Sequence, residues 1–298
     1  MDGKNEEAPV AVVGATGMLG RAIVRNLAAG GARVRALVRK SANPTRMDEL
    51  RRAGAEFVEG DLGHGDALAA LCKGARAVVS TASSTLSRQS GDTIESVDRD
   101  GQIRLVEAAE RASVERYVFV SFYPFADGSP LQAAKRAVEE RLEQSRLSYT
   151  ILRPTFFMDV WLSPAVGFDA ANRRAVIFGP GTRPISWIAL EDVARFAVGA
   201  LDSEGARGKR LDLGGPEALT PLEVVRLVEE LRGGRMQIEH VPEEALGEAF
   251  AAATDPLERS FAALKLGYAR GQVVDVAAAL AAVPLHLTTV REHVERNF

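Results

Sequence analysis

The feature that most constrains the fold of this chain is an apolar run that ends in three evenly spaced glycines. Val10–Val13 predicts a short buried strand, and Gly14, Gly17 and Gly20 follow it at intervals of three residues. Within Met18–Leu27, apolar side chains recur every four positions, which is the spacing of one helix face. The segment therefore predicts a buried strand, a glycine loop and a helix in direct succession.

Such a turn brings free backbone N–H groups and the positive end of a helix dipole to one point. A dinucleotide pyrophosphate fits that point, and glycine is needed where a side chain would block the phosphate or the contact between helix and strand. The alternative is a tight strand–helix turn that binds nothing. We expect five residues of the loop to contact the phosphates, namely Gly14, Thr16, Gly17, Met18 and Leu19.

Strand and helix patterns alternate through the first half of the chain, which favours an α/β fold with a doubly wound parallel sheet of the Rossmann type. Further strands of this sheet are expected at Val34–Val38, Glu56–Val58, Ala77–Thr81, Tyr117–Ser121, Tyr149–Leu152 and Arg210–Leu213. Helices are expected at Arg99–Ala112, capped by Asp98 or Asp100, and at Leu131–Gln144 and Glu191–Leu201.

The pattern loosens after Pro154, which predicts a smaller C-terminal α+β cap that binds substrate. A strand pair is expected at Ala175–Phe178 and Pro184–Ile188, a helix from the capping box at Thr220 to about Arg232, and a strand at Met236–Val241, followed mostly by alanine-rich helix. We predict a flexible tail at 1–8, a nucleotide-binding domain at 9–154 and the cap at 155–298, with residues from about 189 to 213 returning to the main sheet.

Composition excludes several classes of partner. The 298 residues carry a net charge of −3, so the chain has no general attraction to nucleic acid or to an acidic membrane surface. No segment predicts a membrane span or a signal peptide, and no spacing of His, Cys, Asp and Glu predicts a metal site. The single cysteine, Cys72, follows Leu68 and Leu71 in an apolar helix and is expected to fill the core. A cytoplasmic monomer or homodimer that binds a small-molecule substrate agrees with these properties.

The residues after the second strand indicate which nucleotide binds. An acid there would hydrogen-bond the ribose hydroxyls of NAD(H), whereas this chain has Arg39, Lys40 and Ser41, which suit the 2′-phosphate of NADP(H). NADP(H) is therefore preferred and NAD(H) stays possible, because the two cations are also ordinary surface charges. Other residues expected along the nucleotide are Asp61 and Leu62 beside the adenine, and Thr81, Ala82 and Ser83 beside the ribose and phosphate.

One lysine interrupts an apolar helix face. Leu131, Val138 and Leu142 form the face, and Lys135 occupies it between them. A buried ammonium needs a partner, and at this edge of the sheet a nicotinamide ribose or a substrate oxygen would serve, which suits proton transfer. The alternative is a lysine whose stem packs inward while its ammonium reaches water. Ser121 ends the fifth strand, where a hydroxyl can bond a carbonyl oxygen, and Tyr123, two residues on, is a candidate pocket wall or hydrogen-bond donor.

The sequence is rich in aromatic and apolar residues after the sixth strand. We expect the nicotinamide near Ser121, Lys135 and Pro154, with Phe156 as a further residue that contacts the cofactor. The expected wall of an apolar substrate pocket consists of Phe157, Met158, Trp161 and Trp187. An aromatic cluster is more often plain core, and that alternative stays open.

Five segments together resemble the atypical short-chain dehydrogenase/reductases, and within them the NmrA-like and isoflavone-reductase-like proteins. They are Gly14–Gly20, Arg39, Asp98–Gly101, Arg116–Ser121 and Tyr149–Pro154. The resemblance implies a Rossmann domain that binds NAD(P)(H), and it places Lys135 where isoflavone-reductase-like enzymes have their catalytic lysine. The wider family carries a tyrosine four residues before that lysine as proton donor. This chain has Leu131 there instead.

These features support three hypotheses. The first is an NADPH-dependent oxidoreductase that reduces an electron-poor carbon (an enone, quinone or aromatic ketone) of a mostly apolar small molecule. In it, Lys135, Ser121 and Tyr123 are the candidate catalytic residues. The second is an NADP(H)-sensing regulatory protein without hydride transfer, which the missing tyrosine favours. The third is a redox-neutral isomerase or cyclase.

Overall fold

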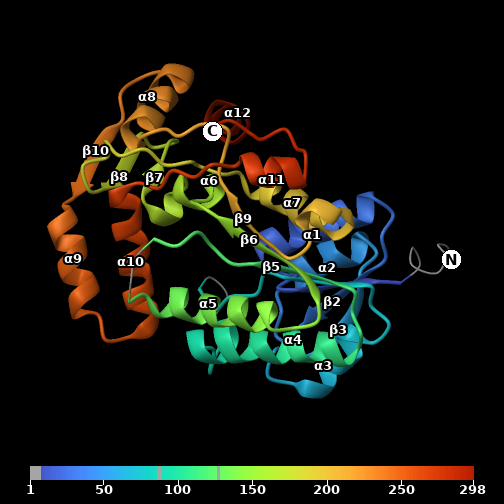
Figure 1. Ribbon diagram of the computed structural model, residues 1–298. Helices are drawn as coiled ribbons and strands as arrows, with labels where there is room; N and C mark the ends of the chain where they lie inside the picture. The colour runs from blue at the N-terminus through green and yellow to red at the C-terminus, as the bar shows by residue number, and fades with distance from the viewer. Residues whose placement is uncertain (1–7, 86–88, 126–127) are drawn as a thin grey trace.

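The computed structural model describes residues 8–85, 89–125 and 128–298. Seven strands form one parallel sheet in the order β3-β2-β1-β4-β5-β6-β9, so the predicted Rossmann sheet is confirmed (Figure 1). The strands span β1 Val10–Val13, β2 Val34–Val38, β3 Glu56–Glu59, β4 Ala77–Ser80, β5 Arg116–Val120, β6 Ser148–Pro154 and β9 Lys209–Leu213. The expected tail at 1–8 lies outside the described residues except for Ala8.

Helices cover both faces of this sheet, and this burial explains its continuous apolar strands. One face packs against α1 (Met18–Ala29), α2 (Pro44–Arg52) and α7 (Leu190–Asp202). The other packs against α3 (Gly65–Cys72), α4 (Gln102–Arg111) and α5 (Pro130–Glu143). Cys72 is fully buried in this second layer, which confirms its expected place in the core. Among the described residues, no helix combines the length and the apolarity that crossing a membrane needs.

The helix expected from Arg99 begins earlier and in a different form. A π-helical segment, η1 (Ile94–Gly101), precedes α4. Its cap is Thr93, whose side chain accepts from the Ser96 N–H while the Ser96 hydroxyl accepts from the Thr93 N–H. The predicted caps Asp98 and Asp100 are therefore wrong, because both lie inside the helical segment.

The smaller part of the molecule is built on a three-stranded sheet, β10-β8-β7. Its strands are β7 (Phe168–Asp169), β8 (Arg174–Phe178) and β10 (Gln237–Val241). The helices of this part are α6 (Met158–Trp161), α8 (Pro221–Arg232), α9 (Glu243–Ala252), α10 (Pro256–Arg270) and α12 (Val290–Asn297), with a short 3₁₀ turn, η2 (Pro164–Val166), beside β7. Helix α11 (Ala277–Ala282) and the 3₁₀ turn η3 (Glu204–Ala206) pack at β9 of the main sheet. The expected capping box at Thr220 is present.

The predicted pairing of Ala175–Phe178 with Pro184–Ile188 is wrong. Strand β8 pairs with β7 and β10, while Ile185 makes isolated bridges to Leu219 and Gln272. The chain after β8 cannot fold back on it as a hairpin, because β10 and β7 already occupy both edges of β8. The domain boundaries stay a prediction, although β9 does pair in parallel with β6.

Candidate functional site

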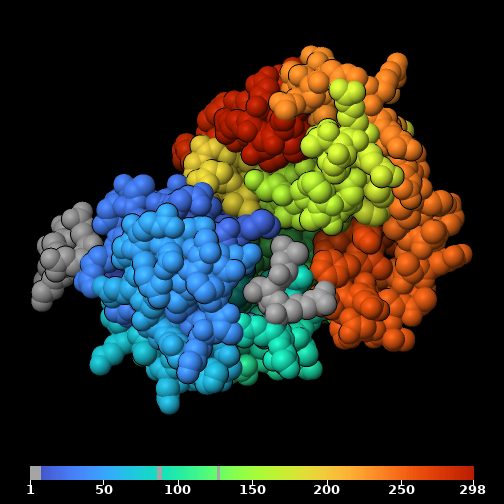
Figure 2. Space-filling view, turned by 180° about the vertical axis from the view of Figure 1, so that it is seen from behind, coloured from blue at the N-terminus to red at the C-terminus, as the bar shows by residue number. Residues whose placement is uncertain are grey.

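The loops that carry most of the expected site residues meet at the carboxyl ends of the central strands, where parallel sheets bind ligands at the point of strand-order reversal. The Thr81 N–H donates to Val13 O over 2.9 Å, which joins the ends of β4 and β1. The Tyr123 N–H donates to Pro154 O over 3.0 Å, which joins the segments that follow β5 and end β6. Viewed from behind, the blue N-terminal segments lie on one side of the molecule and the lime to orange later segments on the other (Figure 2).

Two glycines of the first loop are required by the protein itself. Gly14 has φ +82° and lies so close to the end of β4 that a Cβ would be 2.6 Å from Thr81 Oγ1. A Cβ on Gly20 would lie 2.1 Å from Gly14 O, which is an impossible contact. Both residues therefore bring α1 close to the sheet.

Gly17 has no comparable reason to be glycine. Its φ is −73°, and the nearest atom to an added Cβ is Gly14 O at 3.2 Å. As the cap of α1 it has no side chain to accept from the first amides of the helix, which leaves them available to a ligand. The next residue, Met18, is exposed. This cradle fits a diphosphate at the start of α1.

A cavity of about 660 Å³ lies beyond β2 and β3, at the place expected for the adenosine end of a nucleotide. The lining includes four of the residues expected along the nucleotide, namely Arg39, Lys40, Ser41 and Asp61. The guanidinium of Arg39 makes two hydrogen bonds to Asp92, at 2.6 and 3.0 Å, so it is held at the cavity by a carboxylate. Of the other expected residues, Leu62 is buried in the core and does not line this cavity.

Asp61 is a fixed carboxylate at this cavity. Although burial opposes its ionisation, the hydrogen bond from the Gly63 N–H and the contact with the His64 ring hold the pKa of Asp61 below its ordinary value. An ionised group here accepts hydrogen bonds only. It therefore suits an amino group or hydroxyl of a ligand and repels a phosphate.

Lys135 is buried, as the sequence predicts, and its ammonium does not reach water: the side chain is 5 % exposed. Its Nζ lies 3.4 Å from Asp98 Oδ1, 3.4 Å from Ala82 O and 5.1 Å from the centre of the Phe119 ring. The predicted partners were a ribose or a substrate oxygen, whereas the structure supplies a carboxylate from η1. The ammonium thus lies beside the loop that follows β4.

Asp98 is the functional candidate that the sequence did not reveal. It is completely buried, and its Oδ2 accepts hydrogen bonds from the Ser84 N–H (3.0 Å) and the Ser84 hydroxyl (2.6 Å). The available signal was Thr93 with Ser96, which starts the helical segment early and turns Asp98 inward. Nothing local to Asp98 points to Lys135, since the two meet only through the packing of η1 against α5.

The hydroxyl-bearing candidates differ in their surroundings. Ser121 is buried at the end of β5, and its Oγ finds no hydrogen-bond partner in the part of the chain that the structure describes. Such an orphan is rare in a folded protein and marks a position where a ligand can supply the missing bond. Tyr123 is half-buried two residues on. At the position of the wider family's tyrosine, Leu131 is buried against Ile94 and Ala134 and offers no proton.

The expected substrate residues separate into two groups. Trp161 stays partly exposed, and its ring packs with Phe156 and Tyr268. Met158 and Trp187 are completely buried in the core of the smaller part. Phe157 packs instead against the core of the main sheet. Of the predicted wall residues in this aromatic cluster, Trp161 is the one whose side chain is partly exposed and so accessible to a ligand.

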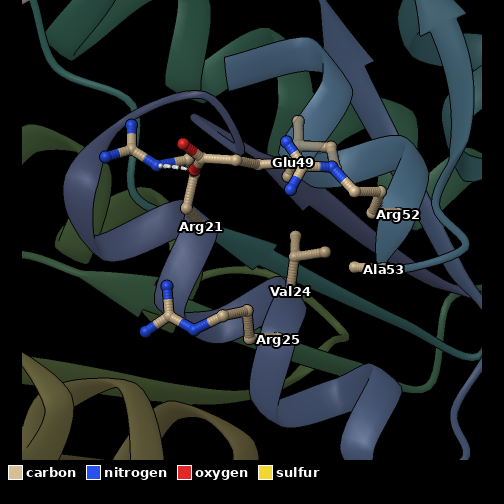
Figure 3. A pocket seen from close by; sticks show the side chains of 7 residues that line it. Arg21, Val24, Arg25, Glu49, Arg52 and Ala53 are labelled. Atoms are coloured by element: carbon tan, nitrogen blue, oxygen red, sulfur yellow. Dashed lines mark ion pairs between the residues drawn. The ribbon is translucent and has the colours of Figure 1, made fainter. Parts of the chain in front are cut away.

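A second cavity, of about 420 Å³, lies between α1 and α2 (Figure 3). Its lining is Arg21, Val24, Arg25, Glu49, Leu50, Arg52 and Ala53. Arg21 pairs with Glu49 over 2.8 Å, as the dashed line shows (Figure 3). None of the residues expected at the site lines it.

Comparison with known proteins gives a family and several relatives. Residues 6–294 match the model of the NmrA-like family. The photosystem II assembly factor Ycf39 of Synechocystis is 32 % identical over 78 % of this chain and 70 % of its own length. A (4-alkanoyl-5-oxo-2,5-dihydrofuran-3-yl)methyl phosphate reductase of Streptomyces griseus is 29 % identical over 83 % of this chain and 82 % of its own.

The fold is also that of solved structures. An NADPH-dependent quinone oxidoreductase from Escherichia coli, crystallised with NADPH, superposes with a TM-score of 0.75 at 22 % identity, over 96 % of this chain and 99 % of that one. The likeness shows the fold, and the site residues of this chain are argued from their own geometry.

Proposed function

Because this chain belongs to the NmrA-like family, we propose that it is an NADPH-dependent reductase of a mostly apolar small molecule with an electron-poor carbon, such as an enone, a quinone or an aromatic ketone. The observation that carries the proposal is the incompletely paired ammonium of Lys135, at the same sheet edge as the orphaned hydroxyl of Ser121. The reductase among its relatives and the NADPH in a structure of the same fold support it.

The residues divide along the sheet edge. Gly17 and the first turn of α1 hold the pyrophosphate, with Gly14, Thr16, Met18 and Leu19 around it. The 2′-phosphate binds at Arg39, Lys40 and Ser41, and NADP(H) is therefore preferred over NAD(H). The nicotinamide end lies beside Pro154 and Phe156, and Trp161 belongs to the substrate side.

NADPH supplies a hydride when bound, and the reduced product needs one proton in addition. Lys135 holds or relays that proton at Nζ, since Leu131 has no hydroxyl with which to do so. Ser121 donates its hydroxyl hydrogen to the substrate oxygen and so orients the carbonyl. The low exposure of both side chains keeps water from the reacting atoms.

The test is loss of absorbance at the nicotinamide band when the protein is mixed with NADPH and a panel of quinones, enones and aromatic ketones. We expect turnover of at least one compound, and a fall in rate of about two to four orders of magnitude for Lys135→Ala. The matched control is Lys73→Ala, which removes an exposed lysine and should keep the wild-type rate. Tight NADPH binding without turnover of any compound would contradict a reductase.

A second candidate function is a nucleotide-binding protein that acts on a partner protein without hydride transfer. Two observations favour it: the buried Leu131 in place of a proton-donating tyrosine, and the 32 % identity to a photosystem II assembly factor. A binding protein of this kind must distinguish NADPH from NADP⁺, because a ligand shifts only states that it binds differently. Equal affinity for both forms, with no change in assembly state, would exclude it.

A further inference from the structure

We propose that Asp98 is a positioning residue, which holds the ammonium of Lys135 at the carboxyl edge of the sheet. The inference deepens the proposed function and rests on it. Asp98 is completely buried, and its carboxylate contacts Ser84 and Lys135. It therefore acts through the lysine.

The two carboxylate oxygens of Asp98 have different surroundings: one is hydrogen-bonded to Ser84, and the other faces Lys135. Its Oδ2 accepts two hydrogen bonds from Ser84, at 3.0 Å from the N–H and 2.6 Å from the hydroxyl. Its Oδ1 has no hydrogen bond of good geometry within the described chain and faces Nζ of Lys135. The loop after β4 thus fixes the carboxylate so that its free oxygen points at the ammonium.

The distances distinguish this pair from an ordinary buried salt bridge. Charge-assisted hydrogen bonds are normally about 2.7–2.9 Å long. Both oxygens near Lys135 Nζ are 3.4 Å away. Because an ammonium has three protons to donate, Lys135 is held in place yet keeps capacity for a shorter bond to a further acceptor. A ribose hydroxyl or a substrate oxygen is an acceptor of that kind.

Helical spacing places Asp98 on the inner face of η1. The buried residues of η1 are Ile94, Val97, Asp98 and Gly101, and the same face continues with Gln102 at the start of α4. Gln102 Nε2 donates to Ala82 O over 2.9 Å, the carbonyl that Lys135 Nζ also contacts. Gly101 lets η1 approach the chain after β3, because a Cβ would lie 2.7 Å from Leu62 Cβ.

A double-mutant cycle separates positioning from folding. Asp98→Asn should lower kcat about 10- to 100-fold with a smaller change in the NADPH dissociation constant, since it misplaces the amine but leaves the expected phosphate contacts of the nucleotide in place. In the Lys135→Ala background, the same change should have no further effect on the rate. Equal losses in both backgrounds, or a loss of NADPH affinity alone, would overturn the proposal. The matched control is Asp100→Asn, a half-exposed acid in the same segment that pairs with Arg99.

A readout that needs no activity distinguishes failure of this inference from failure of the proposed function. The labelling rate of Lys135 by acetic anhydride, followed by mass spectrometry, should rise in Asp98→Asn, because the amine is released from its carboxylate. An unchanged rate overturns the positioning role even in an active enzyme. If Asp98→Asn does not fold, Ser84→Ala removes one hydrogen bond to the carboxylate. It should lower kcat and raise the labelling rate of Lys135 in the same directions, by smaller factors. A wild-type protein that neither binds nor oxidises NADPH refutes the proposed function alone.

Discussion

Asp98 Oδ1 and Lys135 Nζ lie 3.4 Å apart, and neither side chain is more than 5 % exposed. Removing two charges from water carries a penalty of several kcal/mol for each ion, which their attraction offsets only when both are present. Losing one member of the pair should therefore cost stability as well as activity. Its effect on stability and its effect on activity can be tested separately.

The first prediction concerns stability. Lys135→Met leaves the Asp98 carboxylate buried without its cation, and should lower the free energy of unfolding by about 3–5 kcal/mol. Adding Asp98→Asn to it should recover part of that loss, since no charge then remains at the site. Urea denaturation of the single and double variants measures both values. A Lys135→Met protein as stable as wild type would show that the pair is not formed in solution.

The second prediction separates two glycines that the sequence alone treats alike. Gly20→Ala should destabilise the protein strongly, because its Cβ would lie 2.1 Å from Gly14 O. Gly17→Ala should fold normally, because its φ of −73° suits any residue and the nearest atom to the Cβ is 3.2 Å away. Its methyl group would instead occupy the phosphate cradle and weaken NADPH binding.

Thermal melting and nucleotide titration of the two variants check this pair of expectations. A Gly17→Ala protein with normal melting temperature and normal NADPH affinity would exclude the loop as a phosphate site. Gly31→Ala is a useful third variant. Gly31 has positive φ and open space around it, so it reports backbone strain without a packing clash.

The parallel sheet could be predicted from sequence because its information is local. Apolar runs such as Val34–Val38 and the glycine loop after Val13 are visible within a few residues, and β1 to β6 lie where the pattern places them. The pairing in the smaller sheet could not, since β8 pairs with β10, some sixty residues further along the chain, and Ile185 bridges to Leu219 and Gln272 outside any strand. No period within Pro184–Ile188 distinguishes such bridges from a hairpin.

The site shows the same division. The inward position of Lys135 follows from the spacing of Leu131, Val138 and Leu142, and the structure confirms its burial. Asp98 lies on the buried face of η1 at ordinary helical spacing from Ile94 and Gly101. Its pairing with Lys135 could not be predicted, because it depends on how η1 packs against α5, a helix far along the chain. Burial of Met158 and Trp187 likewise depends on how the whole smaller part packs.

The third prediction concerns the nucleotide. Arg39→Ala should weaken NADPH binding about 10- to 100-fold and leave NADH nearly unchanged, because one charge-assisted phosphate contact contributes about 1.5–3 kcal/mol. Isothermal titration with both nucleotides measures the ratio. Arg52→Ala, an exposed arginine of the other cavity, is the matched control and should alter neither affinity. An unchanged ratio of NADPH to NADH affinity in Arg39→Ala would show that the 2′-phosphate binds elsewhere.

The fourth prediction uses the single cysteine as a probe of the sheet's second layer. Burial raises the pKa of Cys72 to about 11, so the reactive thiolate is suppressed in the folded state. Labelling by a thiol reagent at pH 8 should therefore be slow in native buffer and fast in denaturant. The raised pKa also makes the free energy of unfolding depend on pH. An unfolded thiol loses its proton near pH 8.5 whereas the folded thiol keeps it, so the protein should become less stable as the pH rises from about 8.5 toward 11. Cys72→Ala should remove that pH dependence, and native labelling as fast as that of free cysteine would show that α3 opens readily.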